Sequence, residues 1–174
     1  MKDEWVGNIN DFEQYATVRA LHCATARPLI FCWMLTALTP RTTPATFEYL
    51  AQPSQYRHLD SHAFDRLCEI VRSGDRSTLG VERHEVLGDA LFVRTVLSSD
   101  PNTRLRMLLE IEVATATRRS LVVFDPDIGL NPKSVRKGSS RSSAYVFDDE
   151  VGHVFSAGHS IVVYQHFPRM EREA

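Results

Sequence analysis

Two carboxylates that follow a short apolar run are the first residues able to do chemistry. The run Leu121–Phe124 stops at Asp125-Pro126-Asp127. Four apolar residues bounded in this way are typical of a strand buried on both faces of a parallel sheet. Open α/β sheets bind ligands beyond the carboxyl ends of such strands. We therefore predict a site here, whose carboxylates bind a metal ion, act as a base or accept hydrogen bonds from a substrate amine. The alternative is a turn that the proline stiffens.

A second apolar run ends in polar and aromatic groups in the same way. It begins at Ser160 and leads into Tyr164-Gln165-His166-Phe167, with Arg169 two residues on. An imidazole at His166 is suited to acid or base chemistry near neutral pH, and an aromatic ring at Tyr164 or Phe167 is suited to stacking on a base. The alternative is a packed aromatic strand end. We expect this strand to lie beside Leu121–Phe124.

Between these two runs lies a basic segment, residues 131–143. It combines four cations with five serines and one glycine, and no acid occurs between Asp127 and Asp148. We predict a mobile loop that binds phosphates, because cationic side chains and serine hydroxyls both donate hydrogen bonds to phosphate oxygens. The alternative is a solvated loop. The cations are Lys133, Arg136, Lys137 and Arg141.

The elements that must position these residues alternate between helix and strand. Such alternation implies right-handed crossovers and a mostly parallel sheet covered on both sides. We therefore predict one α/β domain over residues 1–174, a Rossmann-like three-layer sandwich. Asn10 and Ser61 are the expected N-caps of the first two long helices. The expected helices are 10–23, 46–52, 61–74, 101–117 and 148–158, and the expected strands are 28–36, 90–97, 121–124 and 160–164.

Composition excludes some classes of function. The chain has 174 residues, of which 43% are hydrophobic, enough for a sizeable core. Its formal net charge is -2, so any contact with nucleic acid must come from a local patch. Three widely spaced cysteines predict buried thiols in a reducing compartment, and hence a cytoplasmic protein. No apolar run approaches membrane-spanning length, so no membrane insertion is expected. The oligomeric state is not predicted.

Other patterns carry less weight. His58 and His62 have a helical metal-binding spacing, but a cap at Ser61 would leave His58 outside the helix, so we predict no metal site there. Neither a nucleophile elbow nor a Walker-type phosphate loop is present, which disfavours hydrolase and kinase functions. The stretch Ala37–Pro44 contains no glycine, so its backbone cannot approach a ligand as closely as a glycine-rich turn does.

Several stretches together resemble a known group of sequences, largely uncharacterised bacterial and phage proteins. More distantly, Gly7-Asn8 with Asp11, followed by a strand and an Asp-Pro strand end, is similar to the methyltransferases that modify an adenine amino group in large-subunit ribosomal RNA. This resemblance implies a methyltransferase-like fold and S-adenosylmethionine as cofactor, held by Gly7, Asn8, Asp11 and Thr36. The stretches are Trp5–Tyr15, Tyr56–Asp60, Phe124–Leu130, Lys133–Gly138 and Tyr164–Arg169.

The Asp-Pro-Pro-Tyr motif of that enzyme class matches Asp125-Pro126-Asp127-Ile128. The resemblance implies that Asp125 and the carbonyl of Pro126 accept hydrogen bonds from the target amine. Asp127 and Ile128 stand where the class has its second proline and its stacking aromatic, so base stacking would fall to Tyr145, Tyr164 or Phe167.

Three hypotheses follow. The first is a nucleic-acid amino methyltransferase, or a close derivative of one, which grips the amine with Asp125 and the phosphates with the basic segment. The second is a nuclease in which Asp125 and Asp127 hold Mg²⁺ and Lys133 stabilises charge on phosphorus. The third is a non-catalytic phage or defence factor that binds nucleic acid or an acidic partner.

Overall fold

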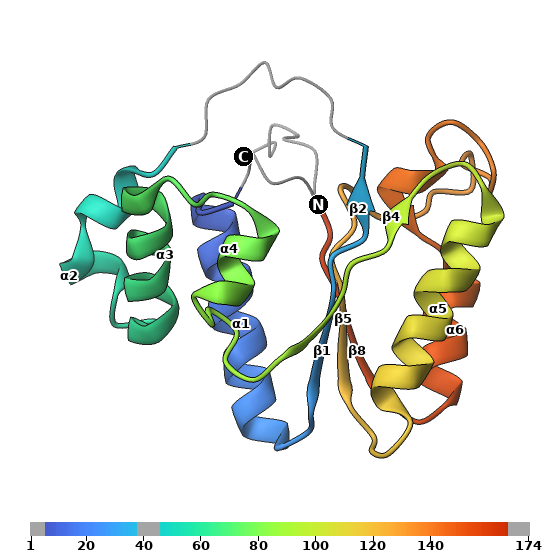
Figure 1. The fold of residues 1–174 in the computed structure, drawn as a ribbon, viewed down its shortest axis with the longest axis horizontal. Coiled ribbons are helices and arrows are strands. Elements are labelled where there is room, and N and C mark those ends of the chain that lie inside the picture. The colour runs from blue at the N-terminus through green and yellow to red at the C-terminus, as the bar shows by residue number, and fades with distance from the viewer. Residues whose placement is uncertain (1–5, 38–45, 167–174) are drawn as a thin grey trace, which may run out of the picture.

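A four-stranded parallel sheet forms the centre of the computed structural model, which describes residues 6–37 and 46–166. Its strand order is β3-β1-β5-β8, and every neighbouring pair is parallel (Figure 1). The predicted parallel sheet is thereby confirmed, as is the adjacency of β5 and β8, in which Phe124 pairs with Val163. The strands are β1 (Leu29–Cys32), β3 (Leu91–Val93), β5 (Leu121–Phe124) and β8 (Ser160–Val163).

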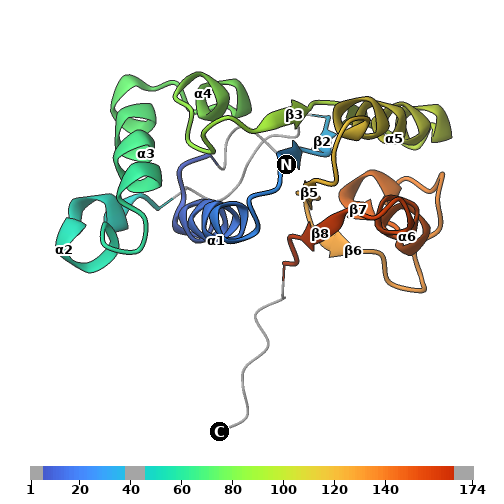
Figure 2. The same ribbon diagram turned by 90° about the horizontal axis from the view of Figure 1, so that it is seen from below.

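Helices cover both faces of this sheet and complete a Rossmann-like three-layer sandwich (Figure 2). Alternate residues of β1 point to opposite faces: Phe31 packs into the core under α1, and Ile30 into the core under α5. One face carries α1 (Ile9–Thr25), α3 (Ser61–Ser73) and α4 (Thr78–Arg83), and the other carries α5 (Pro101–Thr115) and α6 (Asp148–Ser156). Beside α3 lie α2 (Pro53–Tyr56) and the 3₁₀ helix η2 (Glu48–Ala51). The short helix predicted over 46–52 is this 3₁₀ helix, and Pro53 begins α2 instead of ending the helical segment.

The prediction of unbroken strands over 28–36 and 90–97 is wrong. Both strands stop and then resume as a separate parallel pair, β2 (Leu35–Thr36) with β4 (Val96–Leu97). The chain leaves β1 at Met34, a buried residue with a φ of 44°, which takes the backbone out of the extended conformation. A second separate parallel pair, β6 (Gly129–Leu130) with β7 (Tyr145–Val146), follows β5.

Two helix caps differ from the prediction. Asn8, not Asn10, caps α1, because its side chain accepts hydrogen bonds from the backbone N–H groups two and three residues on. Asp60, not Ser61, caps α3 in the same way. Gly74 ends α3 in the left-handed conformation, as predicted.

The prediction of buried cysteines is correct for two of the three. Cys32 and Cys68 are buried, but Cys23 is exposed, because it lies on the solvent side of the last turns of α1. Within the described ranges, none of the helices is both long and apolar enough to cross a membrane.

Candidate functional site at the carboxyl ends of β1 and β5

The carboxyl ends of β1 and β5 form the topological switch point of the sheet. After β1 the chain crosses to β3 over the face of α3 and α4, whereas after β5 it crosses to β8 over the face of α6 (Figures 1 and 2). Ligands bind at such a point in open parallel sheets. The predicted residues Asp125, Pro126 and Asp127 follow β5 directly, and they therefore lie at this edge.

Asp125 is a buried carboxyl, only 2% exposed. Its backbone N–H donates to the carbonyl of Cys32 on β1 over 2.9 Å, which fixes the turn after β5. Burial raises the pKa of Asp125 to about 6; the charge of Asp127 also raises it, and a hydrogen bond from Gln14 lowers it. Asp125 thus exchanges a proton near neutral pH, as a general base or a switchable hydrogen-bond acceptor requires.

A second buried carboxyl, Asp11 of α1, belongs to the same electrostatic environment. Burial raises the pKa of Asp11 well above its ordinary value, and the charge of Asp125 raises it further. Hydrogen bonds from the backbone N–H groups of Gly7 and Asn8 oppose these effects. Buried carboxyls whose pKa values are raised by burial and by a neighbouring carboxylate are common in sites of acid–base chemistry.

Gln14 contributes to the site although the sequence did not single it out. Its Nε2 donates to Oδ1 of Asp125 over 3.0 Å, which links α1 to the end of β5. The sequence feature that points to Gln14 is its position three residues after Asp11, which puts the two side chains on the same face of a helix. The hydroxyl of Tyr15 is likewise buried near both carboxylates; burial, then Asp11 and Asp125, raise the pKa of Tyr15 well above its ordinary value.

The residues expected to hold a cofactor at the start of α1 are bonded to one another. Gly7 N–H donates to Oδ2 of Asp11 over 2.9 Å, and Nδ2 of Asn8 donates to Oδ1 of Asp11 over 3.4 Å. The carbonyl of Gly7 accepts from the hydroxyl of Tyr49 over 3.0 Å. Gly7 has a φ of 94°, and a Cβ there would lie 2.8 Å from Cγ2 of Val71. This close-packed cap holds the first turn of α1 against η2 and α3.

Thr36, the fourth residue expected to hold a cofactor, meets Asp127. Its Oγ1 donates to Oδ2 of Asp127 over 2.7 Å. Thr36 ends β2, which comes after β1 in the chain, and Asp127 comes directly after β5. The bond therefore links the segments that follow the two central strands. Two residues predicted from separate patterns are thereby brought together.

Tyr164 and His166 follow β8 and approach the site from its other side. The backbone N–H of Tyr164 donates to the carbonyl of Phe124 over 2.9 Å. Burial raises the pKa of Tyr164 to about 12, and the charges of Asp11 and Asp125 act in the same direction. His166 is exposed, and its ring centroid lies 5.6 Å from that of Tyr164. Tyr164 is therefore a predicted stacking group that lies within electrostatic range of both carboxyls.

Gln165 fixes the chain that follows Asp127. Its Oε1 accepts from the N–H of Leu130 over 2.9 Å, and its Nε2 donates to the carbonyl of Ile128 over 3.3 Å. These bonds need a glycine at position 129, because a Cβ on Gly129 would lie 2.2 Å from Oε1 of Gln165 and its φ is 139°. These hydrogen bonds thus hold together the two motifs that the sequence showed separately, residues 125–130 and 164–166.

The basic segment divides into paired and unpaired cations. Lys137 contacts Oδ2 of Asp149 at 2.6 Å, and Arg141 donates to the hydroxyl of Tyr145 over 3.2 Å. Lys133 and Arg136 are exposed, with no ion pair to any residue in the described part of the chain. Phosphate binding by the four cations and the mobility of the segment stay predictions.

A buried ion pair anchors the segment on the α5 and α6 side. Nη1 of Arg104 donates to both carboxylate oxygens of Glu150 over 2.8 Å, and Nη2 of Arg104 donates to the carbonyls of Tyr145, over 3.0 Å, and of Ser142. Arg104 is 4% exposed and Glu150 is 1% exposed. Val135 is buried against Tyr145 in a small third apolar cluster.

Arg169 and Phe167 lie outside the described residues. His62 contacts the backbone carbonyl of Glu85 at 2.8 Å, and no group of three or more His, Cys, Asp or Glu side chains in residues 6–37 and 46–166 is arranged to hold a metal ion.

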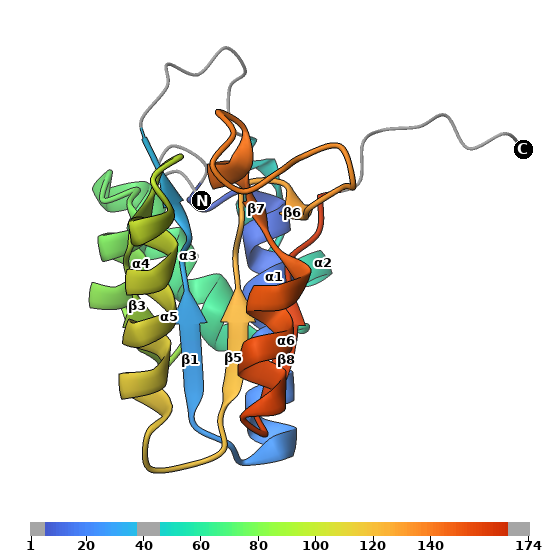
Figure 3. The same cartoon turned by 90° about the vertical axis from the view of Figure 1, so that its right-hand side faces the viewer.

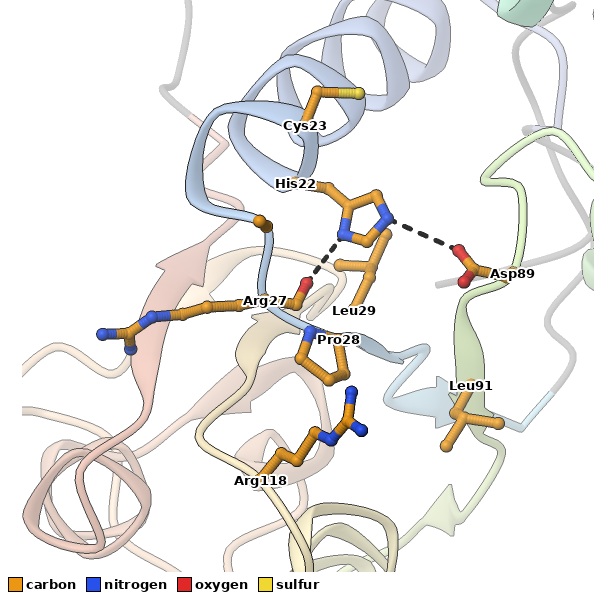
Figure 4. A pocket seen from close by; sticks show the side chains of 9 residues that line it. His22, Cys23, Arg27, Pro28, Leu29, Asp89, Leu91 and Arg118 are labelled. Carbon is orange, nitrogen blue, oxygen red and sulfur yellow. Dashed lines mark hydrogen bonds and ion pairs between the residues drawn. The ribbon is translucent and has the colours of Figure 1, made fainter.

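A separate cavity of about 500 Å³ lies at the opposite edge of the sheet, between the end of α1 and the starts of β1 and β3. Figure 4 shows the ring of His22 between the carbonyl of Arg27, at 2.8 Å, and the carboxylate of Asp89, at 3.4 Å. Arg118 also lines this cavity, which includes none of the predicted site residues. It is distinct from the switch point.

Comparison of the chain with known protein families, with curated proteins and with solved structures gives no match.

Proposed function

We propose that this chain acts on nucleic acid as a methyltransferase-like protein, and that Asp125 holds the exocyclic amino group of a base. The observation that carries the proposal is the hydrogen bond from the side-chain amide of Gln14 to Oδ1 of Asp125. A primary amide presents a planar NH₂ donor, as do the exocyclic amines of adenine and cytosine. An incoming base would replace the Gln14 amide as the donor to this carboxylate.

Neighbouring groups support a base in that position. Tyr164 lies close enough for its pKa to be affected by Asp125, and its ring supplies a surface on which a base can stack. The carbonyl of Pro126 is a second acceptor for an NH₂ group at the same strand end. Lys133 and Arg136, exposed on the segment after β6, would contact the phosphates on either side of the base.

The residues expected to hold S-adenosylmethionine do not fit it in this structure. Gly7, Asn8 and Asp11 bond to one another, and the Thr36 hydroxyl bonds to Asp127. These bonds already use the Gly7 N–H, both oxygens of Asp11 and the Thr36 hydroxyl, and Ala37–Pro44 contains no glycine. We therefore derive no methyl-transfer step, and the proposed chemistry is recognition of the amine by Asp125. Cofactor binding stays a prediction for direct measurement.

The two other hypotheses make different demands on the same residues. A nuclease would require Asp125 and Asp127 to bind Mg²⁺, and a pure binding protein would require only the exposed cations. Recognition of the amine is distinguished from both, because it depends on the chemical identity of the base and on the charge of Asp125.

The test measures binding of single-stranded oligonucleotides by fluorescence anisotropy. The probes are compared in pairs, adenine against hypoxanthine and cytosine against uracil. In each pair a carbonyl replaces the exocyclic amine and the adjacent ring nitrogen gains a proton. We expect the amine-bearing probe of at least one pair to bind at least about tenfold more tightly, the range of a hydrogen bond to a charged group. Asp125→Asn should remove this preference and keep the salt-dependent background. Equal binding of both members of each pair, or a preference that survives in Asp125→Asn, would refute the proposal.

A calorimetric titration with S-adenosylhomocysteine, and separately with Mg²⁺, extends the test. Binding of S-adenosylhomocysteine would show that the cap at Gly7 opens and would support methyl transfer. Binding of Mg²⁺ that depends on both Asp125 and Asp127 would favour the nuclease.

A further inference from the structure

The cavity at the amino ends of β1 and β3 is lined by charges of both signs. Its volume of about 500 Å³ is typical of small-molecule sites. Arg118 reaches it from the loop before β5, and Asp89 reaches it from the loop before β3 (Figure 4). Figure 3 shows the chain before β1 and the chain before β5 next to each other at this end of the sheet. Within the described ranges, no ion pair joins Arg118 to Asp89, so both charges stay available to a ligand.

Arg118 supplies the positive side of the cavity. It is exposed, and its guanidinium has no ion pair with any residue in 6–37 and 46–166. Arg27 also lines the cavity, but its guanidinium turns away toward β8 and donates to the hydroxyl of Ser160 over 2.9 Å. Arg118 is therefore the arginine that a ligand in this cavity would meet. A guanidinium binds a carboxylate through two parallel hydrogen bonds.

Asp89 and the end of α1 supply the negative side. The side chain of Asp89 is 90% exposed, and its carboxylate lies 3.4 Å from Nε2 of His22. The other ring nitrogen of His22 contacts the carbonyl of Arg27 at 2.8 Å, which fixes the ring at the edge of the cavity. His22 belongs to the last turn of α1, where a helix carries a partial negative charge. An ammonium group is the ligand group that this side of the cavity attracts.

Much of the remaining wall is apolar. It is formed by Pro28, Leu29 and Leu91. Leu91 lies on the edge strand β3 and is 53% exposed. A ligand with an apolar side chain would cover Leu91 and remove apolar surface from water on both partners.

The two charges select against ligands that carry only one. A simple anion is repelled by Asp89, and a simple cation is repelled by Arg118. We propose that this cavity binds a small zwitterion with an apolar side chain, a free amino acid or a dipeptide, with its carboxylate on Arg118 and its ammonium group at Asp89. The cavity lies at the end of the sheet opposite Asp125, and the proposal is independent of the proposed function.

The experiment follows the backbone amide signals of the isotope-labelled protein by NMR as L-leucine is added to about 20 mM. This concentration exceeds the roughly millimolar dissociation constant expected for so small a ligand. Saturable shifts should centre on Leu29 and Leu91. Isocaproate lacks only the ammonium group of leucine, and isoamylamine lacks only its carboxylate. Each should bind roughly fivefold more weakly, the upper range for an ion pair that solvent reaches.

Two further probes define the ligand. Glycine, which has both charges but no side chain, should also bind more weakly than leucine, because it leaves Leu91 uncovered. Leucylglycine distinguishes the two sources of the zwitterion: tighter binding than leucine identifies a dipeptide, and weaker binding identifies a free amino acid.

Variants assign each charge to its partner on the ligand. Arg118→Met should bind leucine and isoamylamine equally, and Asp89→Asn should bind leucine and isocaproate equally. Arg119→Met is the matched control, because Arg119 is the next residue and also exposed but does not line the cavity; it should bind leucine as the wild type does. All three changes are at exposed positions, so the fold should be retained.

Three results would overturn the proposal. They are no saturable shift at the cavity in the wild type, an analogue with one charge that binds as tightly as leucine, and an equal loss of leucine binding in Arg119→Met and Arg118→Met.

Discussion

The side-chain amide of Gln14 donates to Oδ1 of Asp125 across 3.0 Å, although the two residues are 111 positions apart in the chain. The bond joins the first helix to the end of the second central strand. It keeps a buried carboxylate in contact with an NH₂ donor that resembles a base amine. In the proposed function the relevant groups at this site are the carboxyl of Asp125, its internal donor Gln14 and the carboxyl of Asp11.

Gln14→Ala should strengthen the binding of an amine-bearing oligonucleotide. The substitution removes the internal donor that competes for Oδ1 of Asp125. A hydrogen bond to a charged group is worth about 1.5–3 kcal/mol, so affinity should rise roughly tenfold or more. Anisotropy titration of an adenine-containing strand measures this. Thr17→Ala, an exposed change on the same helix, should leave affinity as it was. An unchanged or weaker affinity in folded Gln14→Ala would show that this amide does not occupy the position of the substrate.

Asp125→Asn should change the pH dependence of stability. The Asp125 carboxyl has a pKa of about 6 in the folded protein and about 3.9 in an unfolded chain. Between these values the folded state holds the proton more tightly, so this group stabilises the fold at acid pH. That contribution is lost as the pH rises through about 6.

The free energy of unfolding of Asp125→Asn, relative to wild type, should therefore increase between pH 4 and pH 7. Two pKa units correspond to a change on the order of 3 kcal/mol. Urea denaturation at several pH values measures it. Asp89→Asn, which alters an exposed carboxylate in the opposite cavity, is the control and should show no comparable rise. A difference that does not vary with pH would contradict the raised pKa of Asp125.

The sequence predicted the sheet and the edge at which the site lies, for identifiable reasons. The runs Leu121–Phe124 and Ser160–Val163 are short, apolar and bounded by polar residues, and both are parallel strands in the structure. Alternation of helix and strand predicted the crossovers. These features depend on local pattern, which a single sequence contains.

The features that could not be predicted from the sequence depend on how helices and strands are placed relative to one another. Nothing near Gln14 in the sequence shows that α1 turns this side chain toward Asp125. Lys137 has no acid close by along the chain, yet α6 brings Asp149 to it. The break after β1 requires a left-handed conformation at Met34, which propensity opposes and tertiary packing imposes.

Lys133→Gln/Arg136→Gln should weaken nucleic-acid binding and reduce its salt dependence. Each phosphate contact on a single strand contributes about 0.7 to the slope of log affinity against log salt, so losing both should lower the slope by about 1.4. Anisotropy titrations at several salt concentrations measure this. Lys137→Gln is the matched control, because its ammonium group is already paired with Asp149. A slope that falls equally in Lys137→Gln, or in neither variant, would contradict the assignment of Lys133 and Arg136 to phosphates.

Arg104→Met should be strongly destabilising, because it leaves Glu150 buried without the guanidinium that bonds both of its oxygens. Breaking a buried pair in this way costs about 3–5 kcal/mol. The carbonyl of Tyr145 loses its donor as well, so protease cleavage within residues 131–143 should become faster. Urea denaturation and timed proteolysis measure the two effects.

Arg57→Met is the matched control, because the Arg57–Asp65 pair is about half exposed on both sides and should be worth less than about 1 kcal/mol. Replacing both buried partners, as in Arg104→Met/Glu150→Leu, should recover much of the loss, since no uncompensated charge then remains inside. If Arg104→Met costs no more than Arg57→Met, Arg104 does not anchor the basic segment. Arg104→Met/Glu150→Leu also lacks the bonds of Arg104 to the backbone. If it nevertheless recovers wild-type stability and slow proteolysis, the position of the segment depends on neutralising Glu150 and not on those bonds.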